Sequence, residues 1–260
     1  MITSRQNPRI QQVRALLGRA RDRQAAGAFA AEGIRLLEEA AGAGWKPNLV
    51  LFTGDLSPRG RALVERFGAA GAEVEEVSAP VMESLSGTET SQGLLAVLPL
   101  PSPDLPARPD FLLVADSVRD PGNLGALLRT AAAAGVQAVL AAPGTADPFS
   151  PKVVRAGMGA HFRLPVRELD WEAIGRYLGS GRRPRVWVTG AAGGETCWEA
   201  DLRQPLALVI GSEAEGVSAA ARALATGSLR IPMPGKSESL NAAAAGAVLM
   251  FEVVRQRSKS

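Results

Sequence analysis

The chain has 260 residues, of which 46% are hydrophobic and 5% aromatic, so its core is built mainly from Ala, Val and Leu. No apolar run reaches the roughly 20 residues that a membrane helix needs, and residues 1–8 lack the apolar stretch of a secretory signal. A single cysteine, Cys197, excludes an internal disulfide framework. These features predict a cytoplasmic globular protein.

The formal net charge is +3, and the basic excess lies at the N-terminus. Residues 1–35 hold seven Arg against Asp22 and Glu32, a net charge of +5, so the remaining residues sum to −2. Such a segment can hold a polyanion, although a solvated helix face gives the same pattern. One histidine, His161, and one cysteine are too few for a usual zinc site. Carboxylates alone could still hold Mg²⁺, but no cluster of Asp and Glu suggests such a site, so we expect no metal.

The first hundred residues predict a small α/β unit. Apolar residues at helical spacing indicate a basic helix over 9–26, with Asn7 as its cap and Pro8 in its first turn. The other predicted elements are a helix over 29–43, a strand over 49–53, a helix over 61–67 and strands over 73–77 and 94–99. Five prolines within 99–109 predict an extended linker, which separates a domain over 1–98 from one over 110–260.

Beyond the linker, apolar strands alternate with helices. The predicted strands cover 111–115, 138–141, 185–189, 206–210 and 229–231. The predicted helices cover 123–134, 153–158, 171–178, 218–225 and 239–256. Continuous apolar strands that alternate with helices indicate an α/β fold with a parallel sheet covered on both faces.

Three segments of this second half share one design: an apolar strand, a loop rich in small and polar residues, then a helix. They cover residues 111–131, 206–217 and 229–246. In the third, Ser237 or Ser239 is predicted to cap the helix. Ligands bind at the carboxyl ends of strands in such sheets, although each segment alone fits an ordinary turn equally well.

A fourth loop, residues 188–194, looks like the glycine loop of a short-chain dehydrogenase. That family places the loop near its N-terminus and later uses a Tyr with a Lys four positions further on. Here the single tyrosine, Tyr177, precedes the loop, and the residue four positions after this tyrosine is Gly181, not a lysine. A nucleotide-dependent dehydrogenase is therefore disfavoured, because a glycine loop without its context is a weak signal.

Taken in order, the three segments resemble the SpoU (TrmH-type) family of RNA 2′-O-methyltransferases, within the SPOUT superfamily. The matching residues are Asp120-Pro121-x-Asn123-x-Gly125-x-x-x-Arg129, Gly211-x-Glu213-x-x-Gly216 and Ile231-Pro232-Met233-x-Gly235-x-x-x-Ser239-Leu240-Asn241. Many members have Val-Ser after the last Asn, where this chain has Ala242-Ala243. The N-terminal motifs Ser4-x-x-Asn7-Pro8 and Phe29-x-x-Glu32-Gly33-x-Arg35 resemble an L30e-like domain that precedes many ribosomal-RNA members.

The resemblance implies a homodimer, a deep trefoil knot in the C-terminal sheet and S-adenosylmethionine as cofactor. It assigns the cofactor to Thr189, Gly190, Gly211, Ile231, Met233, Ser239 and Leu240. It assigns catalysis to Arg129, Asn123, Glu213, Ser239 and Asn241. Together with the basic segment it implies RNA contacts from Arg5, Asn7, Arg9, Arg23 and Arg35.

The resemblance leaves two questions of function open. A guanidinium ordinarily keeps its proton, so we favour Arg129 as a phosphate clamp and alkoxide stabiliser over a role as base. The separate basic N-terminal domain favours 23S ribosomal RNA over transfer RNA as the substrate. A non-catalytic RNA-binding protein of the same fold is the further alternative, although the motif residues Asn123, Arg129, Glu213, Ser239 and Asn241 are all present.

Overall fold

The computed structural model describes residues 1–179, 183–190, 193–212, 214–235 and 239–258. The chain forms two compact units. Unit 1 comprises Met1–Pro101 with Phe149–Phe162, and unit 2 comprises Ser102–Pro148 with Arg163–Ser260. Unit 1 therefore includes a segment from within the predicted second domain, 110–260. No described helix is both long and apolar enough to cross a membrane.

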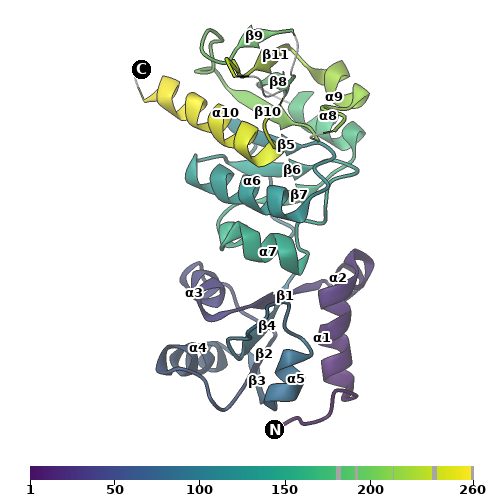
Figure 1. Ribbon diagram of the computed structural model, residues 1–260, viewed down its shortest axis with the longest axis vertical. Helices are drawn as coiled ribbons and strands as arrows, with labels where there is room; N and C mark the ends of the chain where they lie inside the picture. The colour runs from purple at the N-terminus through teal and green to yellow at the C-terminus, as the bar shows by residue number, and fades with distance from the viewer. Residues whose placement is uncertain (180–182, 191–192, 213, 236–238, 259–260) are drawn as a thin grey trace. The chain divides into compact units, whose positions relative to one another are not determined.

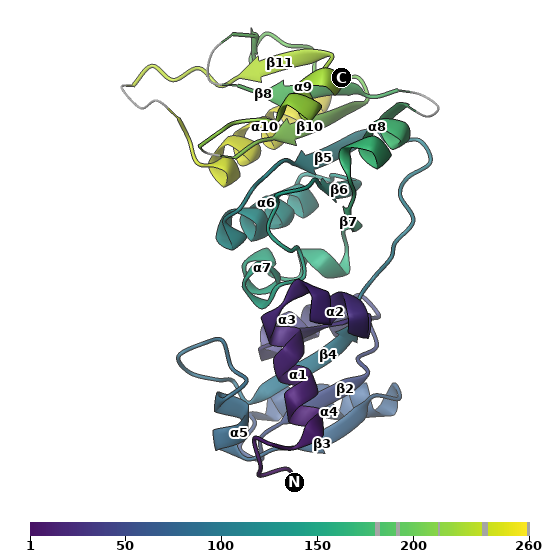
Figure 2. The same cartoon turned by 90° about the vertical axis from the view of Figure 1, so that its right-hand side faces the viewer.

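Unit 1 is built on a four-stranded sheet in the order β1-β4-β2-β3, in which β2 and β3 are parallel and the other pairs antiparallel. Its strands are β1 (Ala28–Glu32), β2 (Leu49–Phe52), β3 (Glu73–Glu76) and β4 (Leu94–Pro99). Its helices are α1 (Pro8–Gly18), α2 (Ala20–Ala26), α3 (Ile34–Gly42), α4 (Pro58–Ala69), α5 (Ala79–Glu83), α7 (Pro151–Gly157) and the short 3-10 helix η1 (Ala160–Phe162). Helix α1 lies along the sheet (Figure 2) and packs Ile10, Val13 and Leu16 into its core.

The predicted helix over 29–43 is wrong in its first part. Residues Ala28–Glu32 form β1, every residue of which is buried, and α3 begins only at Ile34. An Ala-rich run suits a helix by local propensity, but pairing with β4 buries it completely. The predicted helix over 9–26 is also two helices, because the backbone is extended at Arg19. Asn7 caps α1 as predicted, since its side chain accepts a hydrogen bond from the Arg9 amide.

An aromatic cluster explains why Phe149–Phe162 belongs to unit 1. The Phe29 ring lies 6.0 Å from the ring of Trp45 and 5.2 Å from that of Phe149. The Trp45 ring lies 5.3 Å from the ring of Phe162, and its indole N–H donates to the Phe162 carbonyl at 3.1 Å. Phe29 of β1 and Trp45 of a later loop thus share a core with two residues more than 100 positions further along the chain.

Unit 2 is built on a seven-stranded, entirely parallel sheet in the order β7-β6-β5-β10-β8-β11-β9. Its strands are β5 (Phe111–Ala115), β6 (Ala138–Ala141), β7 (Val166–Glu168), β8 (Arg185–Thr189), β9 (Glu195–Thr196), β10 (Leu206–Ile210) and β11 (Gly227–Arg230). Its helices are α6 (Pro121–Ala133), α8 (Trp171–Gly179), α9 (Ala219–Leu224) and α10 (Ala242–Arg257). This confirms the predicted parallel α/β class; β7 and β9 are additions, too short to give a sequence pattern.

Helices cover both faces of this sheet. On one face α8 and α9 bury Ile174, Leu178 and Ala221 in a core shared with β5, β6, β8 and β10. On the other face α6 and α10 lie side by side (Figure 1), with Gly246 of α10 close to Leu127 of α6. The trefoil knot stays a prediction, since the loops that would form it include residues 191–192 and 236–238, outside the described chain.

Candidate functional site

The first motif loop joins β5 to α6. The Asp120 side chain caps α6 by accepting from the Asn123 amide at 2.8 Å, and Pro121 occupies the first turn. The Asn123 side-chain oxygen in turn accepts from the Asn241 side-chain amide at 3.5 Å. Capping therefore fixes the start of α6 beside the third motif loop.

The second motif loop joins β10 to α9. A Cβ atom on Gly211 would lie 2.3 Å from the carbonyl carbon of Gly216, so only glycine fits where these two backbones cross. Ser212 and Gly216 exchange backbone hydrogen bonds of 3.0 Å in both directions and close the loop. Glu213, expected to take part in catalysis, lies outside the described residues.

The third motif loop joins β11 to α10. The cap of α10 is Asn241, whose side chain accepts from the Ala244 amide at 2.7 Å. This corrects the expectation that Ser237 or Ser239 caps this helix: α10 begins at Ala242, and Ser239 precedes the cap, while Ser237 lies outside the described residues. Asn241 thus both caps α10 and reaches Asn123, which joins the first and third loops.

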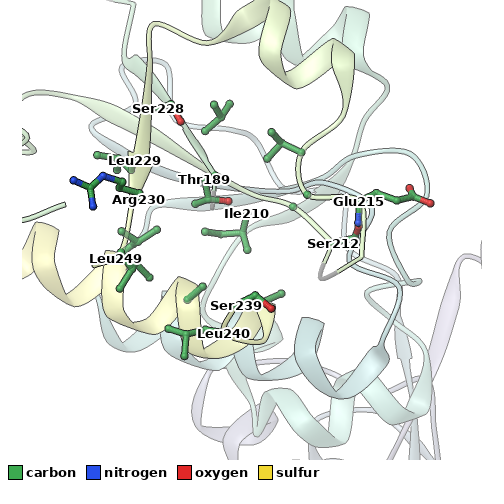
Figure 3. A pocket seen from close by; sticks show the side chains of 18 of the residues that line it. Thr189, Ile210, Ser212, Glu215, Ser228, Leu229, Arg230, Ser239, Leu240 and Leu249 are labelled. Atoms are coloured by element: carbon green, nitrogen blue, oxygen red, sulfur yellow. The ribbon is translucent and has the colours of Figure 1, made fainter. Parts of the chain in front are cut away.

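The second and third motif loops and the glycine loop after β8 surround one cavity of about 880 Å³. All seven residues that the resemblance assigns to the cofactor line it: Thr189, Gly190, Gly211, Ile231, Met233, Ser239 and Leu240. In Figure 3, Thr189 and Ile210 lie at its centre, with Leu229 and Leu249 on one side and Ser212 on the other. The structure therefore brings together residues from loops that are far apart in sequence.

The cavity fits S-adenosylmethionine, the cofactor that the resemblance implies. Its volume lies within the roughly 300–1,000 Å³ of small-molecule sites. Ile210, Leu229 and Leu249 give it apolar walls that could cover a purine ring, and the hydroxyls of Thr189 and Ser212 can bond a ribose or an amino acid group. Gly190 and Gly211 leave backbone atoms within reach of a ligand.

The expected catalytic residues are only partly assembled. Asn123 and Asn241 contact each other, and Ser239 lines the cavity. Arg129 is exposed on α6, six positions after Asn123. At 3.6 residues per turn this places it about 120° around the helix axis from Asn123 and about 9 Å along it. Within one chain, Arg129 therefore projects from a different face of α6 than Asn123.

Two of the five expected RNA contacts are occupied within the protein. Arg9 forms ion pairs with Glu73 at 2.7 Å and Glu75 at 2.9 Å. For Arg23 the expected RNA contact is corrected, because the residue is 3% exposed. Its guanidinium donates to two backbone carbonyls at the end of α1, at 2.6 and 3.2 Å. A buried guanidinium held in this way supports the turn between α1 and α2.

The other three expected RNA contacts lie nearer the surface. Arg5 is exposed, and its Nε donates to the Pro80 carbonyl at 3.2 Å. Asn7 is half-buried and serves as the cap of α1. Arg35 lies in the first turn of α3 and is exposed. Of the five residues, Arg5 and Arg35 are therefore the better placed to meet RNA.

Sequence reasoning missed the charged residues around the cavity. Arg222 and Arg230 both line it, beside the predicted residues. Asp116, directly after β5, is fully buried and reaches the second motif loop. Its signal was present, since a carboxylate follows an apolar strand directly. Among the described residues no group of His, Cys, Asp or Glu side chains could hold a metal ion.

Comparison with known proteins agrees with this geometry. Residues 110–251 match the SpoU rRNA Methylase family, and residues 7–96 match the MRM3-like substrate binding domain. The 23S rRNA (uridine(2479)-2'-O)-methyltransferase of Streptomyces viridochromogenes is 36% identical, over 98% of this chain and 92% of that protein. The Bacillus subtilis 23S rRNA (guanosine(2553)-2'-O)-methyltransferase RlmP is 32% identical, over 90% and 91% respectively.

Solved structures agree as well. The crystal structure of an AdoMet-bound rRNA methyltransferase from Sinorhizobium meliloti is similar with a TM-score of 0.87 and 32% identity, covering 98% of this chain and 97% of that one. The similarity thus extends over both units and includes a protein that holds the cofactor. The chain therefore belongs to the SpoU rRNA methylase family and is an RNA methyltransferase that uses S-adenosylmethionine.

Proposed function

We propose that this protein transfers a methyl group from S-adenosylmethionine to a ribose 2′-hydroxyl of 23S ribosomal RNA. The observation that carries the proposal is the cavity that all seven expected cofactor residues line together. Relatives that match nearly the whole chain are named for this reaction on 23S rRNA. A substrate of this kind also fits a protein that works in the cytoplasm.

The residues divide into a cofactor side and a ribose side. When bound, S-adenosylmethionine supplies an electrophilic methyl group on its sulfonium. The chain must then hold the ribose hydroxyl in line with that group, and most of the rate gain comes from this alignment. Asn123 and Asn241, whose side chains meet at 3.5 Å, would orient the ribose, and Arg129 would neutralise the charge on the attacking oxygen or its phosphate.

Mapping of methyl groups on RNA tests the proposal. Total RNA from cells that lack the protein is incubated with it and labelled cofactor, and ribose methylation is then located by resistance to alkaline cleavage. We expect label at a defined 2′-hydroxyl of 23S rRNA. Label in transfer RNA would support the alternative substrate, and label confined to protein would refute the proposal.

Calorimetry separates the enzyme from a non-catalytic RNA-binding protein of the same fold. We expect S-adenosylmethionine to bind the wild-type protein, and Gly211→Val to abolish this binding, because a side chain there would collide with the Gly216 backbone. Wild-type protein that binds RNA but no cofactor would favour the non-catalytic alternative.

The active form is a homodimer in which one subunit's Arg129 completes the site of the other. Arg129 is exposed and lies on a different face of α6 than Asn123, so it is placed to act on a second molecule. Phe251, which is 49% exposed on α10, offers an apolar surface for pairing of two copies. Sedimentation in solution measures the oligomeric state directly.

Mixing of two inactive variants tests the shared site. Arg129→Ala lacks the ribose-side charge and Gly211→Val lacks the cofactor cavity. If Arg129 acts across the dimer, mixed dimers contain one intact site, and random exchange restores about a quarter of wild-type activity. Dimers that exchange subunits but stay inactive would show that Arg129 acts within its own chain.

A further inference from the structure

Asp116 is a fully buried carboxylate directly after the carboxyl end of β5. It belongs to none of the matching motif residues, and the described lining of the cofactor cavity does not include it. A buried carboxylate costs free energy unless its oxygens are hydrogen-bonded. The hydrogen bonds of the Asp116 carboxylate therefore indicate its role.

Asp116 is bonded to both ends of the second motif loop. Its backbone N–H donates to the Ile210 carbonyl at 2.9 Å, at the point where β10 ends and the loop begins. Its carboxylate Oδ2 accepts from the Ser218 amide at 2.6 Å, where the loop ends and α9 begins. Its other oxygen, Oδ1, accepts from the Ser117 hydroxyl at 3.4 Å.

The loop between these two bonds is a wall of the cofactor cavity. Gly211, Ser212, Gly216 and Val217 all line it. Within the loop, the two backbone hydrogen bonds between Ser212 and Gly216 hold these two residues together. They do not constrain the end of the loop that leads into α9. The bond from the Ser218 amide constrains that end, and a charged acceptor makes it stronger than a neutral one would.

We infer that Asp116 is a positioning residue for the cofactor, whose carboxylate holds the described residues of this loop, 211–212 and 214–217, in the shape that binds S-adenosylmethionine. The inference rests on the proposed use of the cavity. Asp116 touches neither cofactor nor RNA in this role. It acts through the Ser218 amide, so its loss changes cofactor affinity and leaves the ribose side intact.

Four variants test the inference by calorimetric titration with S-adenosylmethionine in the absence of RNA. We expect Asp116→Ala to raise the Kd roughly tenfold or more, because the Ser218 amide loses its partner. Asp116→Asn keeps a neutral acceptor and should raise it by a smaller, severalfold amount. Two controls accompany them. Ser218→Ala keeps the backbone amide and loses only the side-chain cap of α9, whereas Glu252→Ala removes a buried carboxylate far along α10. Both controls should lower the Tm and leave the Kd for the cofactor unchanged.

Two further readouts make the result decisive. Steady-state kinetics should show a raised KM for the cofactor and an unchanged KM for RNA. Hydrogen exchange of the ligand-free protein should be faster across 211–218 in Asp116→Asn and Asp116→Ala than in Glu252→Ala. Wild-type cofactor affinity in either folded Asp116 variant, or unchanged exchange, overturns the inference. Failure of wild-type protein to bind the cofactor refutes the proposed function instead. Hydrogen exchange of the ligand-free protein then still tests whether the Asp116 carboxylate holds the loop.

Discussion

Two arginines of the basic N-terminal segment serve different ends. Arg23 donates to two carbonyls from a buried position, whereas Arg35 lies nearer the surface. We expect Arg23→Met to lower the free energy of unfolding by about 1.5–3 kcal/mol, the usual contribution of a hydrogen bond to a charged group. Urea denaturation measures this effect. The matched variant Arg35→Met should keep its stability and lose affinity for ribosomal RNA, and the reverse pattern would contradict the assignment.

Cys197 is fully buried, and burial, helped by the nearby charge of Glu252, raises the pKa of its thiol to about 11. An unfolded cysteine titrates near about 8.5. The raised value means that Cys197 adds to stability below about pH 8.5 and that this contribution is lost as the pH rises toward 11. We expect no reaction of the native protein with Ellman's reagent at pH 8 and full reaction in guanidinium, whereas rapid native labelling would contradict this burial.

At the scale of elements, the contact between α6 and α10 depends on one glycine. A Cβ atom on Gly246 would lie 2.3 Å from Cδ2 of Leu127, which is itself fully buried. Glycine in a helix costs about 1 kcal/mol relative to alanine, so on propensity alone Gly246→Ala should stabilise. We expect overpacking to win and the variant to lose about 1–2 kcal/mol net.

The control for this prediction is a glycine with open space around it. A Cβ atom added to Gly179, the last residue of α8, would meet nothing within 4 Å among the described residues, so Gly179→Ala should be neutral or stabilising. Thermal unfolding of the two variants beside the wild type makes the comparison. A Gly246→Ala protein as stable as Gly179→Ala would mean that Leu127 moves aside at little cost.

At the scale of the whole molecule, each of the two units is built from two separate stretches of the chain. Unit 1 needs Phe149 and Phe162, which follow more than a hundred residues after Phe29 and Trp45. We expect a fragment of residues 1–101 to keep helical circular dichroism but to bind the dye ANS and unfold without a sharp transition, because its aromatic cluster lacks two of its rings. A cooperative transition like that of the full chain would show that the segment is dispensable.

Local signals in the sequence were sufficient for most of the strands in the second unit. Four of its strands run over the predicted residues, because a strand covered on both faces is apolar throughout and flanked by turn residues. Asn7 and Pro8 marked the start of α1 for the same local reason. The prediction missed strand β1 because Ala-Phe-Ala-Ala carries no pattern that separates a buried strand from a helix.

The candidate site divides in the same way. Its motif residues could be named through the resemblance to a known family, because the motifs are local: the turns that need Gly211 or cap α6 with Asp120 depend on a few adjacent residues. The approach of Asn123 to Asn241, 118 positions apart, could not, because it follows from how α6 and α10 pack. The burial of Arg23 and the reach of Asp116 to Ser218 belong to this second class.

The sequence by itself thus determined the α/β class, the motif loops and the basic N-terminal charge, each of which depends on neighbouring residues. Only the tertiary structure decided which arginine side chains are exposed to solvent and which unit residues 149–162 join. It also decided which carboxylate holds the wall of the cavity. The physical reason is that burial and hydrogen-bond partners are set by residues distant in the chain, so no local pattern carries them.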